Sequence, residues 1–421
     1  MSSSVIETYE DDVQFIDEAG PHIDEEAAQV IGLLAVGSVN YDCAVQTSRG
    51  EINLASVSTG DEPYVPGEKK TPSDTSLPNR QTFLRLLGPL RRECATCDPE
   101  LNHACEDRTV AGNINNIVQY LARNGLEVGA VSAHSRHFRF GEGVRDFSIT
   151  TPRTTSNIVM TARQGEEPFD RCIRRGRKVT DESIAERSDE VMRAAPSLHC
   201  TIISSCPHAD RVLAHSVDNN IPLVAYSPGH SELKDAALKS RTLRQLYERT
   251  SADLRTIVGL NREEYQQLFG HLCVDDIMKI YANDLAVTDG EVGADYLHRD
   301  PETGEILHVS LRNPGFDDAD ILDRQFLGVT PIKHQRYVGT SERPFYLSSV
   351  GAGDRFFATL IYDLTQLADQ QGSRLSLDEI QKTLIHADAE AKQCLGHKGA
   401  TCDLTGNCEC DDLRQQWERQ S

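Results

Sequence analysis

Long apolar runs, basic side chains and cysteines are all scarce in this sequence. No apolar stretch approaches the ~20 residues that cross a bilayer, so we expect no membrane-spanning helix. Lys and Arg number 43 against 65 Asp and Glu, and a net charge of −22 makes the chain a poor non-specific binder of nucleic acid or anionic membranes. The 12 Cys among 421 residues are too sparse for a disulfide scaffold. With no basic region and apolar run at the N-terminus, these features predict a cytoplasmic protein.

The rest of the composition is that of an ordinary globular protein. Hydrophobic residues make up 38% of the chain and charged residues 26%. The length is sufficient for a large core, since a unit of ~300 residues already buries about three quarters of its unfolded surface. The first 30 residues hold nine acidic side chains and no Lys or Arg. We therefore interpret residues 1–29 as a solvated acidic extension.

Short apolar runs alternate with amphipathic stretches along the chain. Residues 115–123 have a helical pattern that ends at Asn124-Gly125. The capping box Ser376-x-x-Glu379 opens a last long helix that runs towards Cys394. Strands interleaved with helices predict an α/β fold in which a mostly parallel sheet is covered on both faces. The predicted strands include Ile31–Val36, Thr201–Ser205, Pro222–Tyr226, Arg255–Leu260 and Leu285–Thr288.

Two regions interrupt this alternation. Residues 43–110 are polar and rich in turn-forming residues, whereas residues 137–165 alternate polar and apolar side chains as half-exposed strands do. We expect parts of both segments to form a small β lid beside one large α/β domain.

The strongest chemical signal is the segment Ser348–Phe357, SSVGAGDRFF. Its glycines allow a tight turn and a close approach of the backbone to a ligand. The apolar residues that follow have helical spacing, so the glycines fall at a helix N-terminus, where free N–H groups favour an anion. Asp354 in that first turn can accept a proton from a hydroxyl beside a phosphate. The alternative is a purely structural role, in which the motif is a loop with an acidic helix cap.

With this motif the sequence resembles the ribokinase-like (PfkB) carbohydrate kinases, whose signature is Asp-Thr-x-Gly-Ala-Gly-Asp-x-Phe. Four other family landmarks follow in the expected order, and the resemblance extends over residues 31–401. It implies a three-layer α/β/α kinase domain at 30–401, followed by a Cys-containing tail at 402–421. The similar segments are Gly37–Asp42 (GSVNYD), Gly112–Asn116 (GNINN), Asn261–Glu264 (NREE), Thr288–Gly293 (TDGEVG) and, at the end of the core, Gly399-Ala400.

The resemblance implies transfer of the γ-phosphoryl group of ATP to a hydroxymethyl group of a sugar or a sugar-like substrate. It makes Asp354 the catalytic base, and it implies Mg²⁺ near Glu264, held through water. The acceptor would contact Asn40, Asp42, Gly112 and Asn116. The anion hole and the ATP site would be formed by Gly351, Ala352, Gly353, Asn261, Glu264, Thr288, Gly290 and Gly293.

The sequence departs from the family pattern in several places. Ser348-Ser349 replaces the Asp-Thr before the glycines, which puts activation by a monovalent cation in doubt. Ala111-Gly112 replaces the usual Gly-Gly. The intervals between Asp42 and Gly112 and between Gly293 and Gly351 are long, and the second predicts an insertion near residues 312–345.

Several of these residues also have plainer interpretations. Asp42 could be a turn acid after a strand, and Asn116 a helix cap. Asn261 and Glu264 could form a capping box, which is compatible with a magnesium role because Mg²⁺ keeps several waters.

Two cysteine clusters lie outside the family pattern, and each offers the four nitrogen and sulfur ligands of tetrahedral zinc. The simpler interpretation is reduced thiols. His134 and His137 are expected to be solvated loop histidines. The first cluster is Cys94, Cys97, His103 and Cys105, and the second is Cys394, His397, Cys402, Cys408 and Cys410.

Two other functions compete with that of a sugar kinase. A nucleoside kinase of the same family has the same motifs, and the sequence does not identify the acceptor. A non-catalytic, metal-stapled regulatory protein would explain Ser348-Ser349 and the cysteines, but Asp354 speaks against it. A nicotinamide dehydrogenase is disfavoured because no Gly-x-Gly-x-x-Gly follows the first strand. The expected partner is a small molecule, and a homodimer through the β lid is a further hypothesis.

Overall fold

The computed structural model describes the chain in ten segments. They are residues 23–47, 69–70, 108–135, 138–151, 155–162, 170–175, 183–322, 332–339, 351–371 and 375–395. Among these residues, no helix is long and apolar enough to cross a membrane.

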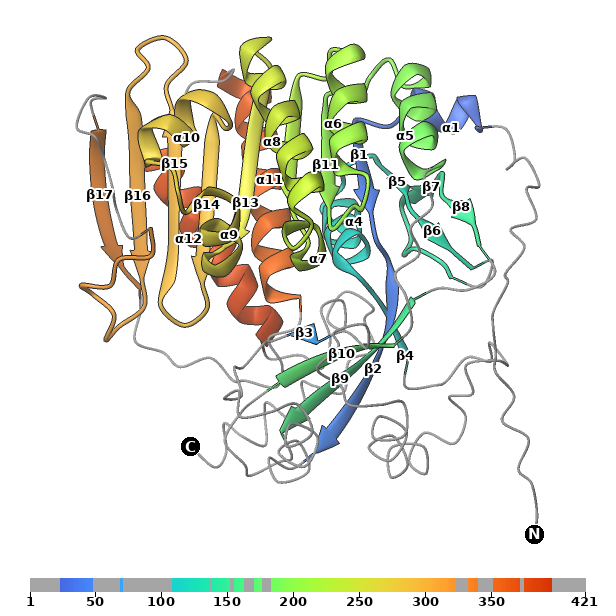
Figure 1. The fold of residues 1–421 in the computed structure, drawn as a ribbon, viewed down its shortest axis with the longest axis horizontal. Coiled ribbons are helices and arrows are strands. Elements are labelled where there is room, and N and C mark those ends of the chain that lie inside the picture. The colour runs from blue at the N-terminus through green and yellow to red at the C-terminus, as the bar shows by residue number, and fades with distance from the viewer. Residues whose placement is uncertain are drawn as a thin grey trace.

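A ten-stranded sheet forms the centre of the molecule, in the order β17-β16-β15-β14-β13-β12-β11-β1-β5-β7 (Figure 1). Its middle strands are parallel and buried on both faces, as their short apolar runs predict. β15 is antiparallel to both of its neighbours. The strands are β1 (Leu33–Gly37), β5 (Val128–Val131), β7 (Val144–Asp146), β11 (Cys200–Ser204), β12 (Leu223–Ser227), β13 (Arg255–Asn261), β14 (Asp284–Asp289), β15 (Gly293–Arg299), β16 (Ile306–Arg312) and β17 (Ile332–Val338).

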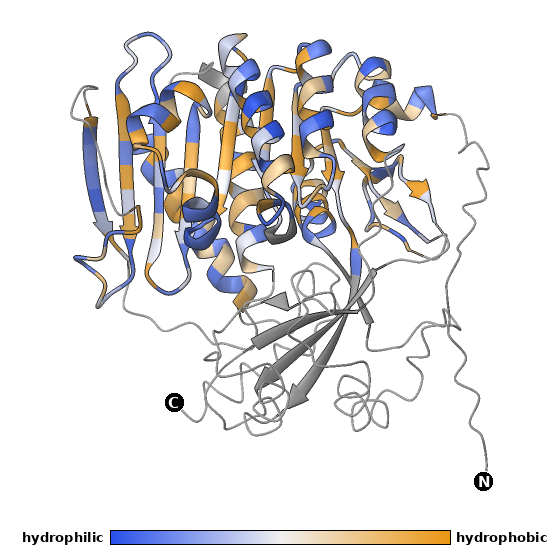
Figure 2. Cartoon of the chain, viewed as in Figure 1, coloured by the Kyte–Doolittle hydropathy of each residue, from blue (hydrophilic) through white to orange (hydrophobic). Residues whose placement is uncertain are grey.

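Helices cover both faces of this sheet and give the predicted three-layer architecture (Figure 1). Figure 2 shows that apolar residues gather on the central strands and on the sheet-facing sides of the helices. One layer holds α4 (Asn113–Arg123), α11 (Ala352–Gln371) and α12 (Leu377–Leu395). The other holds α5 (Ser183–Ala194), α6 (Ala209–Asp218), α8 (Ala236–Ser251), α9 (Arg262–Phe269) and α10 (Val274–Ile280), together with the short α1 (Glu25–Gln29) and α7 (His230–Leu233).

The predicted elements fall within two residues of the observed ones. The predicted strand Thr201–Ser205 is β11, and Arg255–Leu260 is β13. The capping box is present, since the backbone N–H of Glu379 donates to Ser376 Oγ at 3.3 Å and the N–H of Ser376 donates to Glu379 Oε2 at 2.7 Å. α12 follows directly and ends at Leu395, one residue beyond Cys394.

A second, five-stranded sheet lies beyond the carboxyl ends of the parallel strands (Figure 1). The chain leaves β1 at Gly37 and enters this sheet at Asn40, so one continuous stretch joins the two sheets. This is the expected lid, built from two chain segments. In the order β3-β10-β9-β2-β4, its strands are β3 (Lys69–Lys70), β10 (Asp170–Arg175), β9 (Thr155–Ala162), β2 (Asn40–Thr47) and β4 (Arg108–Ala111).

Parts of residues 137–165 were expected in the lid, and the part observed there is β9, which pairs with β2. β7 instead pairs with β5 at the edge of the large sheet. β8 (Ile149–Thr150) pairs with β6 (Ala133–His134) in a separate ribbon. The alternating pattern indicates a half-exposed strand, but it does not reveal which sheet edge that strand joins.

The predicted insertion contains the outermost strand of the large sheet. β17 pairs in parallel with β16, and its residues from Lys333 to Val338 are mostly exposed and hydrophilic (Figure 2). Charged side chains on an edge strand are a common device against pairing with other chains. Lys333 and Arg336 serve that purpose here.

A glycine in β13 lets α11 approach the sheet closely. A Cβ on Gly259 would lie 2.3 Å from the ring of Phe357, which is itself buried. Because Gly259 is two residues from the end of β13, this contact places the first turns of α11 at the carboxyl edge of the sheet.

We predict that Gly259→Ala destabilises the fold by about 1–3 kcal/mol, because the added methyl overpacks the contact with Phe357. Urea unfolding measures the loss. In the double variant with Phe357→Leu the smaller side chain makes room for the methyl group, so the combined loss should be less than the sum of the two single losses. Additive losses would show that this close approach does not position α11.

Candidate active site

The predicted anion site lies at the N-terminus of α11, a long helix that begins directly after Gly351. Gly351 precedes the helix at φ 85°, a left-handed conformation that glycine adopts without strain. The N–H of Arg355 donates to Gly351 O at 2.8 Å. The N–H groups of Ala352, Gly353 and Asp354 precede this bond and are those that a helix leaves without intrahelical acceptors. No atom of the described residues lies within 4 Å of a Cβ placed on Gly353, so these residues leave the backbone there open to a ligand.

Asp354 meets Asn116, a residue 238 positions away, at this turn. Asn116 Nδ2 donates to Asp354 Oδ2 at 2.7 Å. The carboxylate can only accept, so the contact fixes which amide atom is nitrogen. Asn116 is only 5% exposed, and its Oδ1 is buried without a hydrogen-bond partner among the described residues. A buried amide oxygen without a donor is costly, and a hydroxyl group of a ligand would satisfy it.

Gly112 and Asn40 form the second contact between predicted acceptor residues. Gly112 caps α4 at φ 99°, and a Cβ there would lie 2.8 Å from Asn40 Oδ1 and 2.7 Å from Val39 Cα. Only glycine allows the start of α4 to sit this close to the β1–β2 connection. This contact brings the landmark at Gly37–Asp42 beside the one at Gly112–Asn116. The backbone of Asp42 lies in β2 between Thr109 and Asn157.

The predicted nucleotide residues lie at the carboxyl ends of β13 and β14. Asn261 caps α9, where its Oδ1 accepts from Glu264 N at 2.9 Å and Glu264 Oε2 accepts from Asn261 N at 3.0 Å. The capping-box interpretation is therefore correct for this pair. Thr288 is the register partner of Asn261 on the neighbouring strand. The two landmarks thus adjoin each other at one edge of the sheet.

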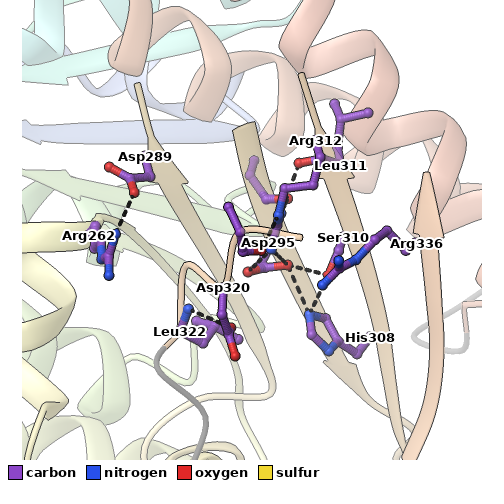
Figure 3. A network of polar contacts seen from close by, with 12 residues as sticks. Arg262, Asp289, Asp295, His308, Ser310, Leu311, Arg312, Asp320, Leu322 and Arg336 are labelled. Atoms are coloured by element: carbon purple, nitrogen blue, oxygen red, sulfur yellow. Dashed lines mark hydrogen bonds and ion pairs between the residues drawn. The ribbon is translucent and has the colours of Figure 1, made fainter. Parts of the chain in front are cut away.

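Contacts on two sides hold the turn between β14 and β15, which follows Asp289. Gly290 and Gly293 have φ angles of 45° and 132°, and a Cβ on Gly293 would lie 2.2 Å from Leu311 O. Arg262, next to Asn261, donates to Asp289 Oδ2 at 3.0 Å (Figure 3). This ion pair ties the turn to the first residue of α9.

A buried network of polar side chains lies beneath the turn between β14 and β15. Asp295 accepts from Arg312 Nη2 at 3.0 and 2.9 Å, and it also contacts His308 and Ser310 (Figure 3). Burial alone would raise the pKa of Asp295, but the hydrogen bond from His308 and the charge of Arg312 outweigh it and lower the pKa to about 2. Arg312 faces Gly293 in the strand register, so this network lies directly beneath the end of the turn.

Most of the predicted zinc ligands lie outside the described residues. This applies to Cys94, Cys97, His103 and Cys105 and, in the second cluster, to every member except Cys394, which is buried in α12. Within the described segments, no group of three or more His, Cys, Asp and Glu side chains could hold a metal ion. The zinc hypothesis stays a prediction. The expectation of a solvated His134 is wrong, because its ring is buried and contacts Asp146.

The arrangement of sheets and helices has many counterparts among solved structures. The adenosine kinase from Sinorhizobium meliloti matches with a TM-score of 0.54, at 15% identity over 88% of this chain and 95% of that one. The ribokinase from Giardia lamblia matches with a TM-score of 0.52, at 13% identity over 92% and 99%. The adenosine kinase from Anopheles gambiae matches with a TM-score of 0.53, at 9% identity over 86% and 95%. The fold is that of ribokinase.

The ribokinase-like fold confirms the architecture that the sequence resemblance implied. The matches extend over nearly all of each solved chain, so the insertions of this chain are additions to a whole fold. No protein-family model and no curated protein matches the sequence. At these identities the fold is shared, and the chemistry must be argued from the residues themselves.

Sequence reasoning missed three residues beside Asp354 in the ribokinase-like fold. Arg355 lies between Tyr120 and Glu390, and all three are buried or half-buried. The only signal available was position, since Arg355 follows Asp354 and Tyr120 is one helical turn after Asn116. Arg312 and Asp295 were missed because single charged residues inside strands give no periodic signal.

We predict that Arg312→Met destabilises the protein by about 3–5 kcal/mol, because it leaves the Asp295 carboxylate buried without its cation. Adding Asp295→Asn removes the uncompensated charge and should recover part of the loss. Chemical denaturation of the two single variants and the double variant measures this coupling. A double variant as unstable as the sum of the singles would contradict the proposed pairing.

Proposed function

We propose that this protein is an ATP-dependent kinase that phosphorylates a hydroxymethyl group of a sugar or a sugar-like alcohol. One observation carries the proposal, namely the Asp354 carboxylate at a glycine-flanked helix N-terminus, hydrogen-bonded to Asn116, which is 238 positions earlier in the chain. The ribokinase-like fold supports it. A purely structural cap at the start of α11 would not explain a buried asparagine beside it whose amide oxygen has no donor among the described residues.

Asp354 acts as the general base in this proposal. Its Oδ2 is held by Asn116, which fixes the orientation of the carboxylate towards an acceptor hydroxyl. The hydroxyl proton passes to Asp354 as the oxygen attacks the γ-phosphorus, and the bond from the γ-phosphorus to the bridging oxygen breaks so that ADP leaves. Asn116 Oδ1 accepts a hydrogen bond from a second hydroxyl of the same acceptor. Sugars and polyols, with neighbouring hydroxyl groups, can make both contacts at once.

The first turn of α11 stabilises the transferring phosphoryl group. Its N–H groups and the helix dipole favour the negative charge that develops there, and they are in place before the reaction. The open space beside Gly353 suits a group that must approach the backbone closely.

The residues at the ends of β13 and β14 suit a nucleotide with its magnesium ion. Asn261, Glu264 and Asp289 supply the oxygen ligands and water partners that Mg²⁺ prefers. When bound, Mg²⁺ neutralises charge on the phosphates. Glu264 is held by the capping box and Asp289 by Arg262, so their carboxylates keep fixed positions. The glycines of the turn at 290–293 have no side chains, so the nucleotide can lie next to the backbone there.

The β lid adjoins the acceptor residues through β2, which begins at Asn40. Its closure over the site would exclude water that could otherwise hydrolyse ATP. Association of two copies through this lid stays a hypothesis, as does the acidic extension's role.

A nucleoside acceptor is the second candidate. Adenosine kinases from Sinorhizobium meliloti and Anopheles gambiae resemble the chain as closely as the ribokinase from Giardia lamblia does. The ribose of a nucleoside carries the same hydroxymethyl and neighbouring hydroxyl groups, so Asp354 and Asn116 would act in the same way. A panel of sugars and nucleosides, assayed by ADP formation with ATP and Mg²⁺, separates the two candidates.

Asp354→Asn should lower kcat by about 10²–10⁴-fold, because general-base catalysis contributes that much. ATP binding should change little, since the helix N-terminus remains. A matched control is Asp363→Asn, two turns further along α11, where the carboxylate contacts His386 outside the site. The control should keep near-native turnover. Near-native turnover in Asp354→Asn would disprove the assignment.

Asp42→Ala should weaken acceptor binding by about 10–100-fold while ATP binding stays within a factor of about two. The reason is that hydrogen bonds from hydroxyls to a carboxylate contribute about 1.5–3 kcal/mol. Calorimetric titration of each ligand into the variant measures both affinities. Equal losses for the two ligands would assign Asp42 a structural role.

A further inference from the structure

Arg355 is a buried cation directly beside the proposed base. Its side chain is 3% exposed, within the apolar layer that joins α4, α11 and α12. Nη1 lies 3.2 Å from Glu390 Oε2 on α12, and the guanidinium carbon lies 4.9 Å from the centre of the Tyr120 ring on α4. One side chain of α11 therefore contacts both neighbouring helices of its layer.

α4 and α11 contact each other at two points, which lie one helical turn apart on α4. On α4, Asn116 and Tyr120 are four residues apart and face the same side. On α11, Asp354 contacts the first of them and Arg355 the second. Tyr120 also forms a hydrogen bond with Thr359, whose Oγ1 donates to the backbone carbonyl of Arg355 at 2.9 Å. Burial raises the pKa of Tyr120 above its ordinary value.

Stability alone is a weak explanation for this cluster. Removing a guanidinium from water is costly, and well-packed apolar residues often stabilise such a site equally well. A planar cation between a carboxylate and an aromatic ring instead has directional requirements that apolar packing lacks. Such a contact suits a helix whose rotation and axial position must be fixed.

We propose that Arg355 is a positioning residue for the reaction, an inference that rests on the proposed kinase function. Its contacts with Glu390 and Tyr120 fix the first turn of α11 against α4 and α12. This placement keeps Asp354 in hydrogen-bond contact with Asn116 and orients the carboxylate towards the acceptor hydroxyl. Arg355 touches neither substrate, and it acts only through its neighbour.

The test compares Arg355→Met with Arg355→Lys in the full-length protein. Methionine keeps most of the volume but loses the charge, and we expect kcat to fall about 100-fold, as a misplacement of about 1 Å can produce. The KM for ATP should stay within about threefold of its native value, because the nucleotide residues are on other elements. Lysine retains a cation between Glu390 and Tyr120, and it should restore at least a tenth of the native kcat.

Two controls separate positioning from general destabilisation. Arg249→Met removes another buried arginine, at the end of α8, whose partners include Ser216 and Ile221. It should lower the melting temperature without a selective loss of kcat. In the Asp354→Asn background, Arg355→Met should cause no further loss, because both changes act through the same carboxylate. A full additional loss there, or an equal effect of Arg249→Met on kcat, would overturn the inference.

A crystal structure of Arg355→Met tests the inference without reference to activity. We expect the distance between Asn116 Nδ2 and Asp354 Oδ2 to exceed hydrogen-bond length in the variant. An unchanged distance of 2.7 Å would overturn the positioning role, whatever the reaction. If instead the bond is lost but the wild-type protein phosphorylates no acceptor in the panel, the kinase proposal fails and the positioning role stands.

Discussion

The hydrogen bond between Asn116 and Asp354 is the contact on which the candidate site depends. It requires two helices from opposite ends of the chain to meet at one edge of a sheet, and close backbone approaches make that possible. Because Gly259 has no side chain, Phe357 of α11 can pack against the sheet. Because Gly112 has none, the start of α4 can pack against the β1–β2 connection. A methyl group at either position would displace a helix end that carries a site residue. The two glycines therefore determine where the helix ends lie, and that placement brings the polar side chains of the site together.

The candidate site relies on local dipoles and paired charges, within a chain that is acidic as a whole. A net charge of −22 opposes the approach of a polyanion, so the phosphate-bearing ligand proposed here would depend on fixed dipoles and on individually placed cations. The N-terminus of α11 supplies the dipole. Arg262 is held by Asp289 at the nucleotide turn, and Arg312 is neutralised by Asp295 beneath it. Each arginine has a carboxylate partner, which limits its attraction for other anions.

The sequence contained enough information for the fold and for the order of the site motifs, but less for the contacts between them. Buried parallel strands are short apolar runs, so β1, β11, β12 and β13 were identified within two residues. The glycine motif before Asp354 predicted a helix N-terminus, and α11 begins directly after Gly351. The lid was harder, because the alternating pattern around residues 144–150 fits any sheet edge. Arg355 could not be recognised as special, since its partners Tyr120 and Glu390 come from other helices.

The separation of Asn116 and Asp354 also has a consequence for how the molecule folds. Contacts between residues 238 positions apart close a large loop, and such contacts form late because the entropy of closure must be offset by structure already present. The parallel strands from β1 to β14 can associate before α11 leaves the ribosome. Asp354 would then reach Asn116 only when the last two helices dock on the finished sheet. A nascent chain would carry most of the central sheet while lacking the contact on which the candidate site depends.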